Sequence, residues 1–363
     1  MLKAGIVGLP NVGKSTLFNA LVANAQAQAA NFPFCTIEPN TGVVSVPDKR
    51  LTLLTSLSQS KETIPTRIEF VDIAGLVKGA SKGEGLGNKF LANTREVDVI
   101  VHVVRCFDND DVIHVAGSID PKRDAEIINL ELGFADLSQI EKRRERLKKL
   151  SKTNKEAQNE DVILSKVLSA IELGNGARSV NLSLEEKELI KPLGLLTEKP
   201  IIYATNLSED ELSNGNSYSE SIEKLASLES AQSIKVSAQV EAELIELGEE
   251  ERKDYLEGLG VNEAGLESLI KATYTLLGLR TYFTTGEKES RAWTIKEGMK
   301  APEAAGVIHT DFQKGFIRAQ TIEYQKLIEA GSFSQARNNG WLRSEGKEYI
   351  VEEGDVMEFL FNV

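Results

Sequence analysis

The sequence predicts an α/β protein with a mostly parallel sheet, an inserted α-helical hairpin and a smaller α+β unit at the C-terminal end. Three observations lead to this prediction. Strand-like and helix-like segments alternate over the first 120 residues, a long charged helical stretch follows, and short strands with glycine-bearing turns fill the last part of the chain. We therefore expect a first domain at 1–120 and 196–277, a helical insertion at 121–195 and a C-terminal domain at 278–363.

The strands of the first domain are predicted from short apolar runs. Ala4 to Gly8 is such a run, and it leads through a glycine-containing turn into a helical stretch that begins at Lys14. Gly42 to Val46 and Arg67 to Val71 are also strand-like. Val97 to Val104 is nearly all β-branched, which is typical of a strand that is covered on both faces of a parallel sheet.

The pattern changes near Pro121, where a long and charged helical stretch begins. Leu130, Phe134 and Leu137 recur at helical spacing. A second apolar stripe follows, made of Val162, Ile163, Val167, Leu168 and Ile171. The polar stretch SKTNKEAQNE between the two stripes is a natural turn, so we expect an antiparallel helical hairpin.

The remainder of the chain returns to mixed structure. Pro200 to Thr205 and Ser233 to Ser237 are strand-like, and the helical segments that follow end near Leu277. After Gly278, the runs RAWTIKEGM, HTDFQKGFIRAQTI and YIVEEGDVMEFLFNV indicate short strands with one intervening helix. They predict a small α+β unit of about 80 residues.

The composition narrows the class of protein. Hydrophobic residues make up 41% and charged residues 27% of the 363 residues, as in folded globular proteins. The formal net charge of -13 argues against attraction of the whole surface to nucleic acid or anionic membrane, so such binding would need a local basic patch. Two cysteines, Cys35 and Cys106, lie far apart, which argues against a disulfide framework or a zinc site. No apolar run approaches the roughly 20 residues that span a bilayer, so we expect a cytoplasmic protein without membrane contact.

The strongest motif follows the first expected strand. Gly8 to Ser15, GLPNVGKS, matches the pattern G-x₄-G-K-[ST] between a strand and a helix. The glycines let backbone N–H groups point at a phosphate, Lys14 can reach the β- and γ-oxygens, and the Ser15 hydroxyl can ligate Mg²⁺. The helix that begins here adds the positive end of its dipole. The motif predicts a nucleoside triphosphate site formed by Asn11, Val12, Gly13, Lys14, Ser15 and Thr16.

Further candidate ligands of metal and phosphate come later in the chain or within the loop. Asp72 ends a strand and opens the pattern D-x-x-G, so its carboxylate can hold Mg²⁺ through water while the N–H of Gly75 contacts the γ-phosphate. Thr36 is either a further Mg²⁺ ligand or an ordinary exposed threonine. Asn11 is either a loop residue that tolerates a left-handed backbone or, through its amide oxygen, a ligand of a monovalent cation such as K⁺.

A fourth element is expected to read the base. Asn206-Leu207-Ser208-Glu209 follows a strand at the point where GTPases carry N-K-x-D, whose Asp accepts both N–H donors of guanine. Glu209 is longer than Asp, and a misfit can leave donors unpaired at about 1–3 kcal/mol each. We therefore expect ATP to be preferred over GTP; alternatively, the loop starts a helix and has no base role. Ser237, after the next strand, resembles a further element that contacts the nucleotide ring.

These motifs together resemble the YchF, or Obg-like ATPase, family of P-loop NTPases. The resemblance covers essentially the full length and includes GLPNVGKST at Gly8 to Thr16, PFCTIEPN around Thr36, DIAG at Asp72, the helical insertion and NLSE at Asn206. It implies an OBG-type G domain and a C-terminal β-grasp domain similar to TGS domains. It also implies an ATPase that uses Mg²⁺, associates with ribosomes and acts in translation or the stress response.

Hydrolysis is expected to be slow. Typical GTPases place a water-orienting Gln directly after D-x-x-G, where this chain has Leu76, which cannot polarise water. The resemblance places His114 near the catalytic side, where its imidazole either accepts from water near pH 7 or merely caps a turn. The candidate catalytic residues are therefore Lys14, Gly75 and His114. His102 lies in an apolar strand and is expected in the core, and His309 belongs to the C-terminal unit.

The helical insertion carries a basic run. KRRERLKK at Lys142 to Lys149 contains six basic residues and one acidic residue, and it is either a solvated helix face or a contact for RNA phosphates or the ribosome. We expect a monomeric, slow regulatory triphosphatase that releases NDP and phosphate and contacts the ribosome or RNA through the insertion and the TGS-like domain. The alternatives are a GTP-specific Obg-type switch and a ribosome-binding adaptor with negligible hydrolysis.

Overall fold

The computed structural model describes residues 2–29, 40–73, 86–109, 117–150 and 154–362. Contacts divide the chain into two compact units: unit 1 contains Met1–Val44 and Glu69–Leu269, and unit 2 contains Ser45–Ile68 and Ile270–Val363. The segment 45–68, which the sequence places in the first domain, therefore belongs to unit 2. The helical insertion lies within unit 1.

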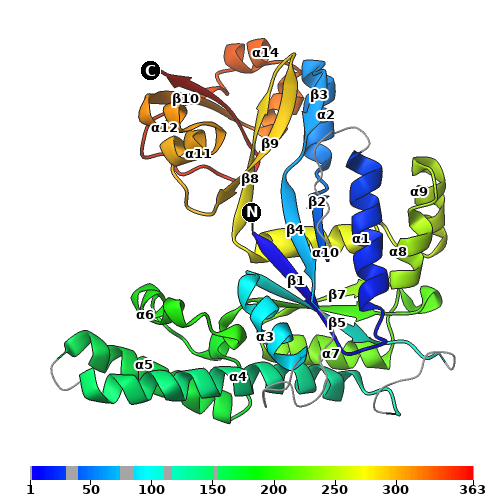
Figure 1. Cartoon of the computed structure of the whole chain (residues 1–363). Coiled ribbons are helices and arrows are strands. Elements are labelled where there is room, and N and C mark those ends of the chain that lie inside the picture. The colour runs from blue at the N-terminus through cyan, green and yellow to red at the C-terminus, as the bar shows by residue number, and fades with distance from the viewer. Residues whose placement is uncertain (1, 30–39, 74–85, 110–116, 151–153, 363) are drawn as a thin grey trace. The chain divides into compact units, whose positions relative to one another are not determined.

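Unit 1 is built around a six-stranded sheet with the strand order β2-β4-β1-β5-β6-β7 (Figure 1). The strands are β1 (Lys3–Val7), β2 (Thr41–Ser45), β4 (Arg67–Asp72), β5 (Val99–Arg105), β6 (Ile201–Asn206) and β7 (Gln232–Val236). β1 pairs in parallel with β4 and β5, and β6 pairs in parallel with β5 and β7. Every residue of β5 and β6 is buried, which confirms the prediction of a strand covered on both faces. Because these strands are parallel, the loops that follow them leave from one edge of the sheet.

Several helices belong to the same unit as this sheet. They are α1 (Lys14–Ala29), α3 (Leu86–Glu96), α7 (Ser217–Leu228), α8 (Ala238–Leu244) and α9 (Glu249–Gly258), with a 3₁₀ turn, η5, at Glu209–Glu211. α10 (Gly265–Leu276) contains the point at which the chain passes from unit 1 into unit 2. α1 packs beside α8, and α7 packs against β6 and β7. Among the described residues, no helix is both long enough and apolar enough to cross a bilayer.

The predicted helical hairpin is confirmed. α4 (Pro121–Leu150) and α5 (Lys155–Glu172) lie side by side in Figure 1. Asn154 caps the start of α5 by accepting from the N–H of Glu156 at 2.8 Å. Arg143 of α4 donates two hydrogen bonds, at 2.6 and 2.7 Å, to the Glu160 carboxylate of α5. A buried apolar core and this two-pronged ion pair hold the two helices together.

The buried face of α4 differs from the predicted stripe. Leu130 and Phe134 are 49% and 52% exposed. The apolar residues that α4 does bury include Ile128, Leu132, Ile140 and Leu147. Leu130 and Phe134 are each offset by two residues from Ile128 and Leu132, and an offset of two residues places side chains on different faces of a helix. In α5, Val162 is likewise exposed, whereas Ile163, Val167 and Ile171 are buried as expected.

A short helix and three 3₁₀ turns complete the insertion. They are η2 (Ala177–Ser179), α6 (Leu184–Ile190), η3 (Lys191–Leu193) and η4 (Leu196–Glu198). The buried carboxylate of Asp136 fastens η4 to α4: it accepts from the N–H of Leu196 at 2.9 Å and from the N–H and the hydroxyl of Thr197 at 2.7 Å each. Burial raises the pKa of Asp136 in spite of these hydrogen bonds.

Unit 2 contains a second six-stranded sheet, with the order β11-β10-β12-β8-β9-β3. The strands are β3 (Glu62–Ile64), β8 (Leu279–Thr285), β9 (Glu289–Lys296), β10 (Phe316–Glu323), β11 (Arg343–Glu345) and β12 (Asp355–Phe361). β8 pairs antiparallel with β9 and parallel with β12, so the sheet is mixed. β3 comes from the 45–68 segment and pairs in parallel with β9. The C-terminal strands therefore form one sheet with a segment that lies more than 200 residues earlier.

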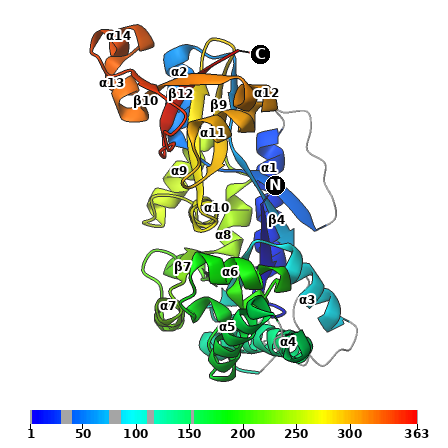
Figure 2. The same ribbon diagram turned by 90° about the vertical axis from the view of Figure 1, so that its left-hand side faces the viewer.

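Helices cover both faces of this second sheet (Figure 2). They are α2 (Lys49–Ser58), α11 (Ala301–Ile308), α12 (Thr310–Lys314), α13 (Tyr324–Ala330) and α14 (Phe333–Asn338). One apolar core contains residues of α11 with Tyr282 and Phe316, and a separate core contains residues of α2, α13 and α14 with Phe283 and Val356. The prediction of one intervening helix in this unit was too low, because α11 to α14 all follow Gly278.

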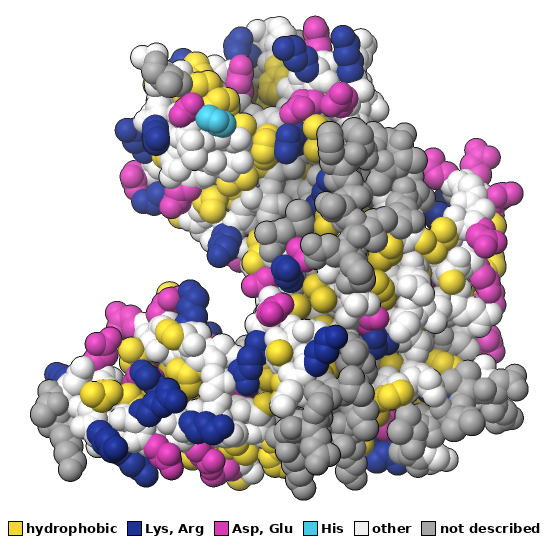
Figure 3. Space-filling model, viewed as in Figure 1, with side chains coloured by type: hydrophobic (Ala, Val, Ile, Leu, Met, Phe, Trp, Pro, Cys, Tyr) yellow, Lys and Arg dark blue, Asp and Glu magenta, His cyan; other side chains and the backbone are white. Residues whose placement is uncertain are grey.

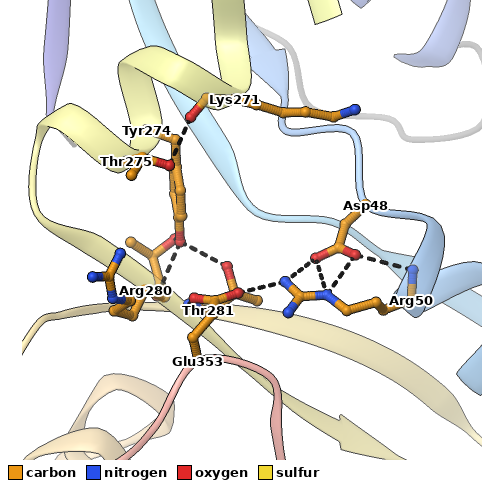
Figure 4. A network of polar contacts seen from close by, with 9 residues as sticks. Asp48, Arg50, Lys271, Tyr274, Thr275, Arg280, Thr281 and Glu353 are labelled. Carbon is orange, nitrogen blue, oxygen red and sulfur yellow. Dashed lines mark hydrogen bonds and ion pairs between the residues drawn. The ribbon is translucent and has the colours of Figure 1, made fainter. Parts of the chain in front are cut away.

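Arg50 anchors the early segment to the rest of unit 2 (Figure 4). Its guanidinium group pairs with Asp48, at the start of α2, and with Glu353, before β12. Glu353 also accepts from the N–H of Thr281 in β8 at 2.7 Å. These two carboxylates raise the pKa of Arg50, against the opposing effect of burial. Arg50 and Glu353 together thus join three separate parts of the chain.

Candidate nucleotide-binding site

The glycine-rich loop connects β1 to α1 and has the backbone that its sequence predicts. Asn11 and Gly13 have positive φ angles of 62° and 90°. A Cβ atom on Gly13 would collide with the side-chain amide of Asn206. A Cβ atom on Gly8 would lie 2.8 Å from the carbonyl oxygen of Val103 and 2.9 Å from a methyl group of Val12. Both glycines are therefore required by close approach of neighbouring atoms.

The Asn206 side chain, expected at the base, supports the glycine-rich loop. Its amide nitrogen donates to the carbonyl oxygen of Val12 at 2.9 Å, and its amide oxygen accepts from the N–H of Ala238 at 2.9 Å. Its backbone oxygen accepts from the N–H of Cys106 at 2.8 Å. Asn206 is buried. It connects the glycine-rich loop to the loops that follow β5 and β7.

Lys14 and Asp72 form an ion pair at the start of α1. The ammonium group of Lys14 contacts the carboxylate of Asp72, which is the last residue of β4. Lys14 is only 8% exposed. Ser15 and Thr16, in the first turn of α1, are exposed. A cation, two hydroxyl groups and the N-terminal end of a 16-residue helix therefore converge at one place.

Oxygen ligands for a hard cation are available at this place. The Ser15 hydroxyl and the Asp72 carboxylate are the donor types that Mg²⁺ prefers. Among the described residues, no group of three or more His, Cys, Asp or Glu side chains could by itself hold a metal ion. Such a site would thus need ligands from the nucleotide or from elsewhere in the chain. Thr36, Gly75, Leu76 and His114 lie outside the described residues.

A pocket of about 610 Å³ opens beside the glycine-rich loop. Its lining residues come from the loops after β1, β5 and β6 and from α1 and α8: Asn11, Gly13, Thr16, Phe107, Asp108, Asn109, Asn206, Leu207, Ser208, Ala238, Gln239, Ala242, Glu243 and Glu246. Leu207 is buried, and its N–H donates to the carbonyl oxygen of Val236 at 2.8 Å. Glu209 is absent from this lining, whereas Glu243 and Glu246 belong to it.

Arg105 holds the pocket wall that follows β5. Its guanidinium group donates to the carbonyl oxygens of Phe107 and Asn109, each at 3.1 Å, and lies 4.6 Å from the centre of the Phe107 ring. Arg105 is 1% exposed. No motif marks this residue, although a single arginine at the end of a mostly apolar strand was a visible signal.

Two further predicted contacts lie at the edge of the pocket. Ser237 precedes α8; its hydroxyl group is buried and has no hydrogen-bond partner in the described parts of the chain. Glu209 accepts from the hydroxyl group of Tyr255 in α9 at 2.8 Å. Neither Tyr255 nor Glu243 was predicted from the sequence. Their side chains come together through the packing of α8 and α9, which no local motif encodes.

The two described histidines away from the pocket match their expected positions. His102 is buried in β5, with its ring centre 5.3 Å from that of Tyr203. Burial lowers the pKa of His102 to about 3, with a smaller effect from Arg178. His102 is thus neutral and belongs to the core, as predicted. His309 caps α12 in unit 2 by accepting from the N–H of Asp311.

Comparison with known proteins matches this chain along its whole length. A family profile described as a 50S ribosome-binding GTPase covers residues 3–166, and the profile YchF-GTPase_C, described as a protein of unknown function, covers 279–362. The relative named ribosome-binding ATPase YchF from Bacillus subtilis is 56% identical over 100% of both chains, and the one from Escherichia coli O157:H7 is 54% identical over 99% of both. The solved structure of the Schizosaccharomyces pombe YchF GTPase matches with a TM-score of 0.90 at 41% identity, covering 99% of this chain and 97% of that one. The chain therefore belongs to the YchF family.

Proposed function

We propose that this chain is a Mg²⁺-dependent nucleoside triphosphatase that prefers ATP to GTP, hydrolyses it slowly to NDP and phosphate, and associates with the ribosome. The observation that carries the proposal is the Lys14 ammonium group, which is held by Asp72 at the start of α1 beside a pocket of about 610 Å³. The names of the relatives from B. subtilis and E. coli support both ATP and the ribosome. On the same basis we propose a monomer in the cytoplasm.

The phosphate tail is proposed to bind to the glycine-rich loop. Backbone N–H groups of Val12 to Thr16 at the start of α1 would surround the β-phosphate. Phosphate oxygens would replace the Asp72 carboxylate as the partner of Lys14, because a triphosphate carries more negative charge than one carboxylate does. The ion pair in the free protein thus holds the Lys14 side chain in position until a polyphosphate arrives.

Asp72, once released from Lys14, is proposed to hold Mg²⁺ through water, together with the hydroxyl groups of Ser15 and Thr36. A bound Mg²⁺ supplies neutralisation of the charge on the β- and γ-phosphates. Asn11 has a left-handed backbone and lines the pocket, and its amide oxygen is proposed to be a ligand of a K⁺ ion held against the phosphates. Gly75 is proposed to donate its N–H to the γ-phosphate.

The base is proposed to occupy the pocket between the loop after β6 and α8. Leu207 and Ser208 line one side, and Ala238 with Gln239 lines another. Asn206 shapes this space through its hydrogen bonds to Val12 and Ala238. Ser237 is proposed to stay close to the base, and Glu209 to act as a selectivity residue. Attack by water is proposed to be slow because Leu76 replaces the usual Gln, with His114 as the candidate group that accepts from water.

The helical hairpin is proposed to contact ribosomal RNA, with unit 2, the TGS-like domain, as a second contact. Of the six basic residues at 142–149, Arg143 and Arg144 are paired with Glu160 and Asp161. The other four, Lys142, Arg146, Lys148 and Lys149, are exposed, and none forms an ion pair with another described residue. Figure 3 shows Lys and Arg side chains gathered along the hairpin. A hollow of about 820 Å³, lined partly by Arg95, Lys142 and Arg146, adjoins them. Lys and Arg side chains without ion-pair partners, placed around a hollow, can neutralise the phosphate groups of an RNA backbone.

The test combines nucleotide competition, turnover and ribosome cosedimentation. We expect ATP to displace a fluorescent ATP analogue at lower concentration than GTP does, and Lys14→Ala to abolish turnover. Better binding of GTP would favour the GTP-specific switch, which the GTPase profile over 3–166 makes the second candidate. Undetectable turnover by the wild-type protein with Mg²⁺ and K⁺, combined with intact cosedimentation, would favour the adaptor.

A further inference from the structure

Two carboxylates from different segments converge on one phenol at the edge of the pocket. The hydroxyl oxygen of Tyr255 in α9 lies 2.8 Å from an oxygen of Glu209, in the loop after β6, and 2.8 Å from an oxygen of Glu243 in α8. The pKa of Tyr255 is raised, first by the hydrogen bond to Glu209. Glu243 lines the pocket, and Glu209 does not.

Tyr255 has too few O–H protons to donate a hydrogen bond to both carboxylates at once. A phenol has one O–H and can donate to one carboxylate at a time. Glu243 has a second donor, because the side-chain amide of Gln239 donates to its other oxygen at 3.1 Å. For Glu209, the Tyr255 hydroxyl is the one side-chain hydrogen-bond donor among the described residues. Loss of the Tyr255 hydroxyl would therefore leave Glu209 without that partner and close to a second negative charge.

The position of Glu209 matters because the two purine bases differ in their donors. Guanine offers an N1–H and a 2-amino group on one edge, and a carboxylate can accept from both at once. Adenine has an acceptor at N1 and no 2-amino group, so it gains nothing from a carboxylate at that edge. A carboxylate held outside the pocket leaves the donors of a bound guanine unpaired and makes no difference to adenine.

We propose that Tyr255 is a specificity-determining positioning residue: it holds the Glu209 carboxylate out of the base pocket and thereby disfavours GTP relative to ATP. This inference rests on the proposed function. Tyr255 is well placed for this role because its ring packs into an apolar cluster with Leu212, Val240, Leu244, Leu256 and Ala264, which fixes the hydroxyl group. The same packing means that phenylalanine can replace Tyr255 with the loss of the hydroxyl group alone.

The test measures the affinities of non-hydrolysable ATP, GTP and ITP analogues by calorimetry with Mg²⁺. We expect Tyr255→Phe to strengthen binding of the GTP analogue about 3- to 10-fold, the size expected for one or two regained hydrogen bonds, and to change that of the ATP analogue less than about 2-fold. Inosine lacks the 2-amino group, so the ITP analogue should gain less than the GTP analogue. Glu243→Gln is the opposite perturbation: it leaves the phenol proton to Glu209 and should weaken the GTP analogue further.

Two controls separate this role from a general effect on the fold. Tyr203→Phe removes a phenol of unit 1 that bonds to Asn129 and Glu229 and does not line the pocket, so it should leave the ratio of GTP to ATP affinity unchanged. In a Glu209→Ala background, Tyr255→Phe should no longer strengthen GTP. An unchanged ratio in Tyr255→Phe, equal changes for both nucleotides, or a gain that persists without Glu209 would each overturn the inference. A wild-type protein that binds none of the analogues would instead overturn the proposed function, and this inference with it. If Tyr255→Phe does not fold, Glu243→Gln provides the test instead. An unchanged affinity of Glu243→Gln for the GTP analogue would also overturn the inference.

Discussion

Replacing Asn206 by alanine should damage both the stability of unit 1 and nucleotide binding. The substitution removes two hydrogen bonds of 2.9 Å, one to the carbonyl oxygen of Val12 and one from the N–H of Ala238. It leaves both backbone groups without these partners in a buried place. Each unpaired group costs about 1–3 kcal/mol, and because the two losses share one site we expect about 2–4 kcal/mol of unfolding free energy in total. We expect ATP affinity to fall at least about tenfold, since the glycine-rich loop, the proposed phosphate site, loses its support.

The assay combines urea unfolding, hydrogen exchange and ATP titration on three variants. Asn206→Ala should speed exchange of the Ala238 amide hydrogen, whereas Asn206→Asp keeps an acceptor for that amide and should leave its exchange slow. Asn206→Asp nevertheless loses the donor to Val12, so its ATP affinity should also fall. Asn214, which is exposed, provides the matched control, and Asn214→Ala should change none of the three measurements. A loss of less than about 0.5 kcal/mol in Asn206→Ala, with unchanged ATP binding, would refute the argument that this side chain supports the loop.

Three other predictions follow from the structure. Burial raises the pKa of Glu241 to about 7, above its ordinary value of 4.5, so the folded state holds this proton more tightly than the unfolded state. The stabilising contribution of Glu241 is therefore greatest below pH 4.5 and is lost as the pH rises toward 7. Across that window, the unfolding free energy of the wild-type protein should fall by up to about 3 kcal/mol relative to that of Glu241→Gln. Urea titrations at several pH values measure this difference. Arg50→Met keeps the aliphatic stem but loses the ion pairs to Asp48 and Glu353. It should lower the unfolding free energy of unit 2 by about 1–2 kcal/mol, which the fluorescence of Trp293 and Trp341 would report during urea unfolding. An unchanged urea midpoint would contradict the anchoring role. The last prediction concerns the four exposed cations of the hairpin, replaced together by Gln: Lys142, Arg146, Lys148 and Lys149. This variant should cosediment less with ribosomes, and the slope of log affinity against log salt concentration should become shallower by up to about 3 to 4, while ATP binding persists. An unchanged slope would exclude the hairpin as the RNA contact.

Much of the fold could be predicted because its signals are local. Val97 to Val104 is nearly all β-branched, and a run of this kind is typical of a strand in the middle of a parallel sheet. Prediction of the fold from the sequence failed where segments that are far apart in the chain pack together. The segment 45–68 looks like ordinary α/β sequence, yet it joins unit 2 because β3 pairs with β9 and Arg50 pairs with Glu353. Such pairings depend on partners more than 200 residues away, which periodicity does not report.

The same distinction applies to the site. The backbone of residues 8–15 could be predicted because a phosphate loop needs glycine, lysine and serine at fixed spacing, and the positive φ angles of Asn11 and Gly13 agree with that need. The same reasoning assigned Asn206 to the base from its motif alone, and it could not see the hydrogen bonds to Val12 and Ala238. It also could not see that Tyr255, 46 residues after Glu209 in the chain, would donate to that carboxylate. A motif specifies which group is present, and tertiary packing decides which partner it has.

The hydrogen bonds of Asn206 imply that the base and the phosphates are not bound independently. One buried side chain satisfies groups on the glycine-rich loop and on the loop after β7, and its own backbone oxygen accepts from Cys106 after β5. Arg105, the neighbour of Cys106, fixes the wall at Phe107 through a further hydrogen bond. A base that displaces any of these walls must therefore strain the glycine-rich loop, where we propose that the triphosphate binds. Discrimination between ATP and GTP should for this reason appear in the geometry at Lys14 as well as in the contacts of the base, and a poorly fitting base should slow turnover more than it weakens binding.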